Sequence, residues 1–181
     1  IVTITPRAQV TFTAPTASIC NKTSSAITLI PNLVGTKFIY TSVVIAGSLT
    51  GNTDNSVAST NTIIGDVLTN TGLVEAIVKY TVTPSSASGC DGTPVDIVIK
   101  VSPSASIASA GIDDEVCDAT TYKLNGNNPS VGIGKWTVVT APNAISFVNT
   151  QYDALVSGLM PGNSYEFKWT ITDVNGCDST S

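Results

Sequence analysis

The sequence predicts an all-β protein that is built from two tandem β-sandwich domains. Apolar and polar residues alternate with a period of two through most of the chain, and no segment shows the apolar stripe of a helix. One stretch is also written twice, first as KYTVTPSSASGCDGT at 79–93 and again as KWTITDVNGCDST at 168–180. In a chain of 181 residues, a repeat at this spacing favours two domains of about 90 residues.

The expected strands are short alternating runs that end at Gly, Pro, Asn or Ser. In chain order they are QVTFT at 9–13, AITLI at 26–30, TKFIYTSVVI at 36–45, AIVKYTV at 76–82, VDIVIKV at 95–101, KWTVV at 135–139, ISFV at 145–148 and YEFKWTIT at 165–172. Because side chains of a strand point to alternate faces, each run has one face for the core and one for solvent. The polar stretch at 48–61 is expected to form a long loop or a weak edge hairpin.

The alternation is clearest in the two repeated strands. Ala76, Val78, Tyr80 and Val82 share one face of the first, and Tyr165, Phe167, Trp169 and Ile171 share one face of the second. We therefore expect both strands to lie against a core.

The domain boundaries follow from the repeat and from composition. The segment SPSASIASA at 102–110 is rich in Ser, Pro and Ala, so we expect one sandwich over 6–103 and another over 104–181. The opening IVTITP resembles the end of the strand VDIVIKVSP, and 1–5 are therefore interpreted as the end strand of a preceding repeat. The second domain stops before an equivalent of VDIVIKV, so it is expected to lack its last strand. The chain is thus interpreted as part of a longer tandem array.

Charge and hydropathy exclude several classes of partner. The net charge is −5 and there are only eight Lys and Arg residues, so a phosphate backbone or an anionic membrane finds little to attract it. No apolar run approaches the roughly 18 residues of a membrane span. We expect no nucleic-acid partner and no direct membrane insertion.

Catalytic motifs are missing from the sequence. The chain has no histidine, which excludes Ser-His-Asp and Cys-His arrangements. No GxSxG, HExxH, P-loop or GxGxxG pattern occurs, and the carboxylates that a glycosidase would need are scattered through loops. We predict that the chain is not an enzyme and needs no cofactor.

The four cysteines occupy repeated positions. SICNKT at 18–23 and EVCDAT at 115–120 are similar, so one pairing of the three that four cysteines allow respects the repeat: Cys20 with Cys90 and Cys117 with Cys177. Such disulfides imply an oxidising compartment and hence export. The alternative is four buried free thiols in a cytosolic protein.

One acidic cluster is a candidate calcium site. Asp113, Asp114 and Glu115 can supply the hard oxygen ligands that calcium prefers, at the expected junction between repeats. The alternative is a solvated loop whose acids keep the chain soluble.

The two tryptophans are expected in the core of the second domain. Trp136 is predicted to lie on a central strand and to pack against a Cys117–Cys177 bridge, with Trp169 beside it. The alternative is a platform on which a sugar ring stacks.

Two longer stretches resemble a known class of repeats. The pattern from Tyr80 to Pro103 resembles the PKD-like repeats of large secreted Bacteroidota surface proteins. The stretch from Ala110 to Cys177 resembles the Ig-like repeats that alternate with them, notably in the giant gliding-motility adhesins of flavobacteria. The resemblance implies tandem Ig-like and PKD-like β-sandwiches, type IX secretion and a place on the outer cell surface. It also implies that DST at 178–180 is an O-glycosylation site, with sugar on Ser179.

The function that these observations predict is mechanical. We expect a non-catalytic, disulfide-stapled stalk or spacer of a cell-surface adhesin that serves gliding motility or attachment. Its expected partners are neighbouring repeats of the same chain, together with surface glycans or abiotic surfaces. The alternative function is an accessory carbohydrate- or substrate-binding module of a secreted hydrolase.

Overall fold

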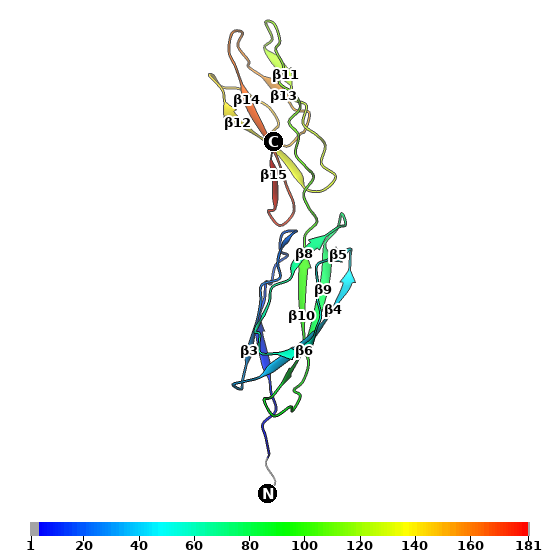
Figure 1. Ribbon diagram of the computed structural model, residues 1–181. Helices are drawn as coiled ribbons and strands as arrows, with labels where there is room; N and C mark the ends of the chain where they lie inside the picture. Colours follow the sequence, from blue (N-terminus) through cyan, green and yellow to red (C-terminus); the bar gives the residue numbers. More distant parts are fainter. Residues whose placement is uncertain (1–3, 181) are drawn as a thin grey trace. The chain divides into compact units, whose positions relative to one another are not determined.

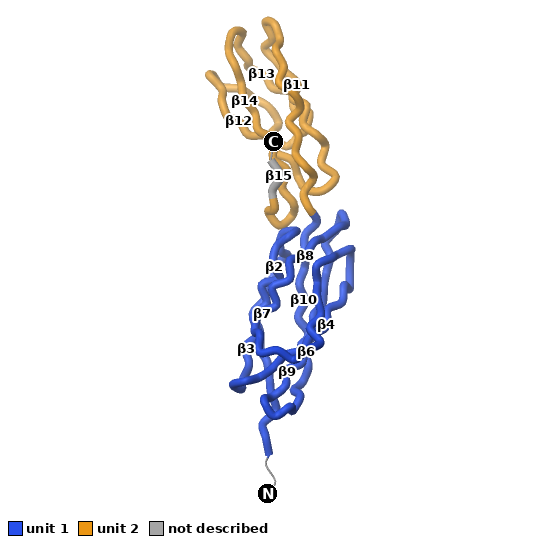
Figure 2. Tube along the Cα trace, viewed as in Figure 1, with its two compact units in different colours: residues 1–103 blue, residues 104–181 orange. Residues whose placement is uncertain are grey.

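The computed structural model describes residues 4–180, with side chains described up to Cys177 (Figure 1). All regular structure in this range is β-strand, and the chain divides into two compact units, residues 1–103 and 104–181 (Figure 2). The prediction of an all-β fold with tandem Ig-like/PKD-like sandwiches is confirmed. No helix long and apolar enough to cross a membrane occurs in the part of the chain that the structure describes.

The described part of unit 1 contains ten strands in two layers. They are β1 Val10–Thr13, β2 Thr23–Ser24, β3 Ile27–Pro31, β4 Lys37–Ala46, β5 Leu49–Thr50, β6 Asn55–Ser59, β7 Ile63–Ile64, β8 Val67–Asn70, β9 Ala76–Ser85 and β10 Val95–Val101. One layer is the four-stranded sheet β10-β9-β4-β6. The other combines β1-β3-β7 with β2-β8-β5, which are joined where the Ser25 N–H donates to the Asp66 carbonyl at 2.8 Å. All the paired strands are antiparallel.

The core of unit 1 is centred on β9. Its side chains alternate between buried and half-buried positions along all ten residues, and Ala76, Val78, Tyr80 and Val82 are fully buried. β4 and β10 pair with β9 on its two sides, so its backbone is hydrogen-bonded within the sheet. The opposite layer contributes the buried side chains of Ile27, Leu29, Ile64 and Leu68.

Up to Thr180, unit 2 contains five strands in two smaller sheets. They are β11 Thr121–Lys123, β12 Ile133–Thr140, β13 Leu155–Ser157, β14 Glu166–Thr172 and β15 Asp178–Thr180. β11 pairs with β13, and β14 pairs with β12 on one side and β15 on the other. β14 therefore lies between two strands of its sheet, as β9 does in unit 1, and these two strands carry the repeated sequence.

Two tryptophans fill the middle of unit 2. Trp136 and Trp169 are cross-strand neighbours in the β12–β14 ladder, both are almost fully buried, and their ring centroids lie 4.9 Å apart. Phe167 meets Trp136 edge-on at 6.4 Å. Their burial places both tryptophans in the core, as predicted, so neither ring is open to a sugar.

Some local predictions differ from the structure. ISFV at 145–148 is not a strand, and only Ser146 forms a bridge, to Ser157. The polar stretch at 48–61 contains the short β5 and the edge strand β6. The last strand of unit 2, expected to be missing, is present over three residues as β15. Residues 1–3 of the predicted end strand lie outside the described part, and the described Ile4 and Thr5 belong to no strand.

Gly134 is required by the tryptophan packing. A Cβ atom at this position would lie 2.0 Å from Cζ2 of Trp169, so the ring would have to move. We expect Gly134→Ala to destabilise unit 2 by about 1–3 kcal/mol, the usual cost of overpacking a core. Urea unfolding followed by tryptophan fluorescence measures this directly, because both tryptophans are in unit 2. The exposed neighbour Lys135→Ala is the control, and equal midpoints for the two variants would contradict the packing argument.

Candidate functional site

A half-buried carboxylate, Asp66, ties a loop to the core of unit 1. The hydroxyl of Tyr80 donates to Asp66 Oδ2 at 2.7 Å, and the Thr53 backbone N–H and hydroxyl both donate to the same carboxylate at 2.8 Å. Burial, the hydrogen bond to Asp66 and the charge of Asp66 together raise the pKa of Tyr80 far above its ordinary value. The phenol therefore stays protonated and acts as a structural donor rather than as an acid or base.

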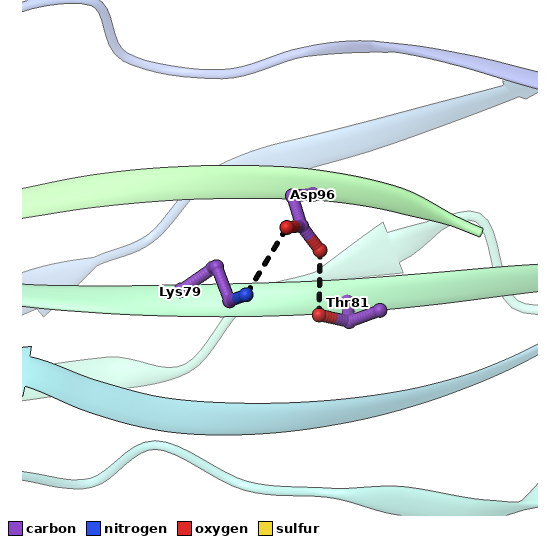
Figure 3. A network of polar contacts seen from close by, with 3 residues as sticks. All are labelled: Lys79, Thr81 and Asp96. Carbon is purple, nitrogen blue, oxygen red and sulfur yellow. Dashed lines mark hydrogen bonds and ion pairs between the residues drawn. The ribbon is translucent and has the colours of Figure 1, made fainter.

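A second polar network lies on the outer face of the four-stranded sheet (Figure 3). Asp96 on β10 accepts from the Thr81 hydroxyl at 2.6 Å and from Lys79 Nζ at 3.1 Å, both on β9. These contacts, the Thr81 hydrogen bond first, lower the pKa of Asp96. Because both members of the ion pair are substantially exposed, the pair contributes little to stability. Its geometry joins the neighbouring strands β9 and β10.

A shallow depression of about 560 Å³ lies beside β12 in unit 2. It is lined by Lys135, Trp136, Thr137, Val138, Ile145, Ser146, Phe147 and Asn149. The side chain of Trp136 is only 1% exposed, so its ring offers no open face on which a ligand could stack. The second aromatic residue of the lining, Phe147, is half-buried.

The predicted calcium ligands are not gathered around one point. Asp114 accepts from the Tyr122 hydroxyl at 3.1 Å and from the Glu115 N–H at 2.9 Å, and Asp113, Asp114 and Glu115 are all exposed. Among the described residues, no group of three or more Cys, Asp or Glu side chains is placed to hold a metal ion. The arrangement matches the alternative, a solvated loop.

The predicted disulfide pairing is wrong. Cys20 and Cys177 are disulfide-bonded cysteines, whereas Cys90 and Cys117 are free and exposed. Hydrogen bonds from Thr5, at 3.2 Å, and then from Ser88 and Ser86 lower the pKa of the Cys90 thiol. A Trp136 contact with a Cys117–Cys177 bridge is excluded for the same reason.

Geometry within unit 1 explains why Cys20 cannot pair with Cys90. Ile19 bridges to Val101, which pairs with Ala76 at the start of β9, whereas Asp91 bridges to Ser85 at the end of β9. Nine residues of extended strand separate these ends by about 30 Å. A disulfide needs Cα atoms within about 7 Å of each other.

In unit 2, Cys117 likewise lies too far from Cys177 to pair with it. The Thr120 carbonyl, three residues after Cys117, accepts from Gly158, whose own carbonyl accepts from Asn143. Asn143 also accepts from Tyr165, directly before β14. Cys177 follows the other end of β14, where its N–H donates to Asp173 at 2.7 Å. The length of β14, about 20 Å, therefore lies between the two regions.

The predicted glycosylation site falls on β15. The backbone of Ser179 pairs with Ile171, and its side chain lies outside the described part of the structure. Sugar on Ser179 therefore remains a prediction. Elsewhere in the chain, the side chain of Asn21 makes two hydrogen bonds with the backbone of Asn70, at 2.9 and 2.7 Å.

Parallel pairing at one end of unit 1 was not predicted from the sequence. The Ile19 N–H donates to the Lys100 carbonyl and the Ser102 N–H donates to the Ile19 carbonyl, both at 2.9 Å. Beside them the Ser18 hydroxyl donates to Glu75, whose carboxylate lies 3.8 Å from Lys100 Nζ. Segment 18–20 shows no strand alternation, so the sequence gives no signal for this pairing.

Asn70 locks the same end of unit 1. Its side chain is buried, and its Nδ2 donates to the carbonyls of Val101 at 2.9 Å and Val74 at 2.8 Å. Together with Asn21, it connects β8, the end of β10 and the segment that follows Cys20. We call the contacts of Ile19, Asn21, Asn70, Lys100 and Ser102 the clamp of unit 1.

Comparison with known families identifies the first half of the chain. Residues 17–105 match the family model of PKD-like domains, so the chain contains a PKD/Ig-like domain. The resemblance to PKD-like repeats is confirmed at this level. A search of curated proteins finds no match.

Two solved structures show a distant likeness. One is SGBP-B of the Bacteroides ovatus mixed-linkage glucan utilization locus in complex with a mixed-linkage heptasaccharide, with 14% identity, a TM-score of 0.35, and coverage of 98% of this chain and 46% of that chain. The other is the chicken CNTN1 FN1–FN3 domains, with 14% identity, a TM-score of 0.36, and coverage of 91% and 66%. The chain thus spans about half the length of the first structure. At these TM-scores the likeness carries no information about function.

Removing the Tyr80 hydroxyl tests the Asp66 network. We expect Tyr80→Phe to destabilise unit 1 by about 1–3 kcal/mol near neutral pH, because Asp66 loses a buried donor. Tyr40→Phe is the matched control, since Tyr40 lies on β4 and meets the Tyr80 ring edge-on at 6.1 Å. Both tryptophans lie in unit 2, so tryptophan fluorescence reports the unfolding of unit 2. A circular-dichroism transition that is not accompanied by a change in tryptophan fluorescence therefore reports the unfolding of unit 1.

The raised pKa of Tyr80 also sets the sign of an alkaline effect. The unfolded chain begins to lose this phenol proton near pH 10, whereas the folded unit keeps it. The stability of unit 1 should therefore be complete below about pH 10 and fall above it, and this fall should be smaller in Tyr80→Phe. Equal alkaline slopes for the wild type and Tyr80→Phe would contradict the assignment.

Proposed function

We propose that this chain, which carries a PKD-like domain, is a non-catalytic repeat segment of a secreted cell-surface protein and acts there as a spacer under tension. One observation carries the proposal: the backbone enters each unit at one end and leaves towards the other. A pull along the chain would therefore act along the length of each sandwich.

The path through unit 1 makes the clamp resist such a pull. The chain enters beside Ala8, whose carbonyl lies against Gly92, and the Gly92 N–H donates to the Pro84 carbonyl at the far end of β9. It leaves after Val101, opposite Ala76. These points are about 27 Å apart along β9. Tension would slide segment 18–20 and β10 in opposite directions, so both 2.9 Å hydrogen bonds of Ile19 would be loaded together.

Unit 2 follows the same plan. The chain enters with Ser106, whose N–H donates to the Val131 carbonyl next to Gly132, and Gly132 lies against the Thr172 carbonyl at the end of β14. β15 starts at that end and runs back along β14, from Thr172 towards Thr170. The backbone thus heads away from the point where it entered.

Cysteine chemistry supports an extracellular place for the chain. Cys20 and Cys177 are disulfide-bonded, and disulfides persist in oxidising compartments such as the cell exterior. The similarity to Bacteroidota repeats supports the finer proposal of an adhesin stalk that is exported by the type IX route and serves attachment or gliding motility. In that setting its partners are neighbouring repeats, surface glycans or abiotic surfaces.

Single-molecule stretching tests the spacer function. The chain is held at its two ends in reducing buffer, so that no disulfide carries the force. We expect two separate unfolding steps, which release about 300 Å for unit 1 and about 250 Å for unit 2, the extended lengths of their chains less their folded lengths. Ile19→Pro removes the N–H that donates to Lys100 and should lower the force of the longer step only.

Ala17→Pro is the matched control. Ala17 is exposed and lies two residues before Ile19, and its N–H makes no hydrogen bond within residues 4–180 as described. The control should unfold at the wild-type force. An unchanged longer step in Ile19→Pro, with equal equilibrium stability, would show that the clamp does not resist tension and would remove the main support for the proposal.

A further inference from the structure

The outer face of the four-stranded sheet in unit 1 carries exposed apolar side chains. An antiparallel sheet that covers a core usually has a polar outer face. Here the side chains that alternate with the buried ones include Ile39, Val43 and Ile45 on β4 and Val98 on β10, each between 40% and 54% exposed. Ile77 on β9, the strand between β4 and β10, is half-buried. Exposed apolar patches mark surfaces that contact other proteins.

The strand register arranges this face in four rows across β4, β9 and β10. In order along the sheet, the rows are Ile39–Thr83, Thr41–Thr81–Asp96, Val43–Lys79–Val98 and Ile45–Ile77–Lys100. Ile45 joins the last row at a bulge, since its neighbour Ala46 pairs with Ile77. Apolar side chains therefore stand in the two outer rows and in the third row, and the second row is polar.

Each charged side chain of these rows already has a partner of opposite charge. Lys79 Nζ lies 3.1 Å from Asp96, and both project from the same side of their strands (Figure 3). Lys100 Nζ lies 3.8 Å from Glu75. The whole chain carries a net charge of −5, which repels a second copy. A face whose charges are paired is a place where two copies can approach with little repulsion.

We propose that this face packs against the same face of a second copy, about a twofold axis that runs across the strands between the second and third rows. The axis reverses the order of the rows. Ile39 of one copy then lies over Ile45 of the other, and Val43 lies over Thr41. Both ends of the contact are therefore apolar on both sides, and the twofold axis makes each contact occur twice.

The charges fit the same axis. Lys79 of one copy lies over Thr81 of the other, directly beside Asp96 of that copy. Each lysine thus approaches two carboxylates, one from each chain, and no like charges face each other among these residues. The match between the face and its own rotated copy is the reason to assign a second copy of the chain as the partner.

The area of the face suits a weak dimer. β4 and β9 are ten residues long, about 33 Å, and four strands are about 19 Å wide. Each copy therefore contributes about 600 Å², and the total of about 1,200 Å² is the lower limit of specific interfaces. Because the contact is isologous, association ends at two copies. This inference goes beyond the spacer function and does not depend on it.

Sedimentation equilibrium of the full chain tests the proposal. Cys90 and Cys117 are changed to Ser, so that their exposed thiols cannot join copies. Between micromolar and millimolar concentration, we expect the average mass of this parent chain to rise and then to level off at the mass of a dimer.

The first variant places like charges in the apolar contacts. Ile39→Lys combined with Ile45→Lys brings ammonium groups face to face and should weaken the dimer at least about tenfold. Ile30→Lys combined with Ile63→Lys is the matched control, because these isoleucines are also exposed but belong to β3 and β7 of the other layer. The control should associate like the parent chain.

A charge exchange tests the register of the two faces. Lys79→Asp puts two carboxylates at the contact in every copy, and Asp96→Lys puts two ammonium groups there. Each variant alone should associate at least about tenfold more weakly than the parent. In an equimolar mixture the carboxylates of one chain meet the ammonium groups of the other, so the mixture should regain the dimer as a heterodimer.

Three outcomes would overturn the proposal. A parent chain that stays monomeric at millimolar concentration shows that the face does not bind a second copy. A dimer that persists in Ile39→Lys combined with Ile45→Lys is joined through another surface. A mixture of the Lys79→Asp and Asp96→Lys chains that associates no more tightly than either chain alone shows that Lys79 does not meet Asp96 of the second copy.

Discussion

Each unit depends on one strand whose inward side chains are buried and which has a neighbour on both sides. In unit 1 this is β9, where Ala76, Val78, Tyr80 and Val82 are fully buried and β4 and β10 flank the backbone. In unit 2 it is β14, which lies between β12 and β15 in its sheet. Its side chains Trp169 and Ile171 are fully buried. The rest of each sandwich covers these side chains. The outward positions of the same strands are thereby free to carry Thr and Lys, as in the network of Asp96, Thr81 and Lys79.

Alternation made these strands predictable, because successive side chains of a strand must point to opposite faces. VDIVIKV at 95–101 coincides with β10, and the repeated stretches contain β9 and β14. The same signal was misleading for ISFV, since an alternating run becomes a strand only where a partner backbone lies beside it, and there only Ser146 finds one. The clamp gave no signal, because its parallel pairing joins Ile19 to a strand about 80 residues away through backbone atoms alone.

The cysteine prediction failed for a topological reason. A repeat in sequence preserves the order of two cysteines but not the end of the sandwich at which each lies. Cys20 lies beside the end of β10 and Cys90 precedes its start, so an entire strand separates them. The Asp66 network was also missed, since Thr53, Asp66 and Tyr80 converge from three separate segments and no spacing in the sequence indicates it. The acidic cluster at 113–115, which the sequence singles out, is a surface loop.

Native-state hydrogen exchange tests the dependence on the two central strands most directly. Amides that open only when a whole unit unfolds should be those of β9 in unit 1 and β14 in unit 2, with exchange free energies equal to the global stability of each unit. The edge strands β1, β6 and β15 should exchange through smaller openings. If the amides of β9 exchanged as fast as those of β6 while other strands of unit 1 stayed protected, the central strand would not organise the sandwich, and this account of the fold would be contradicted.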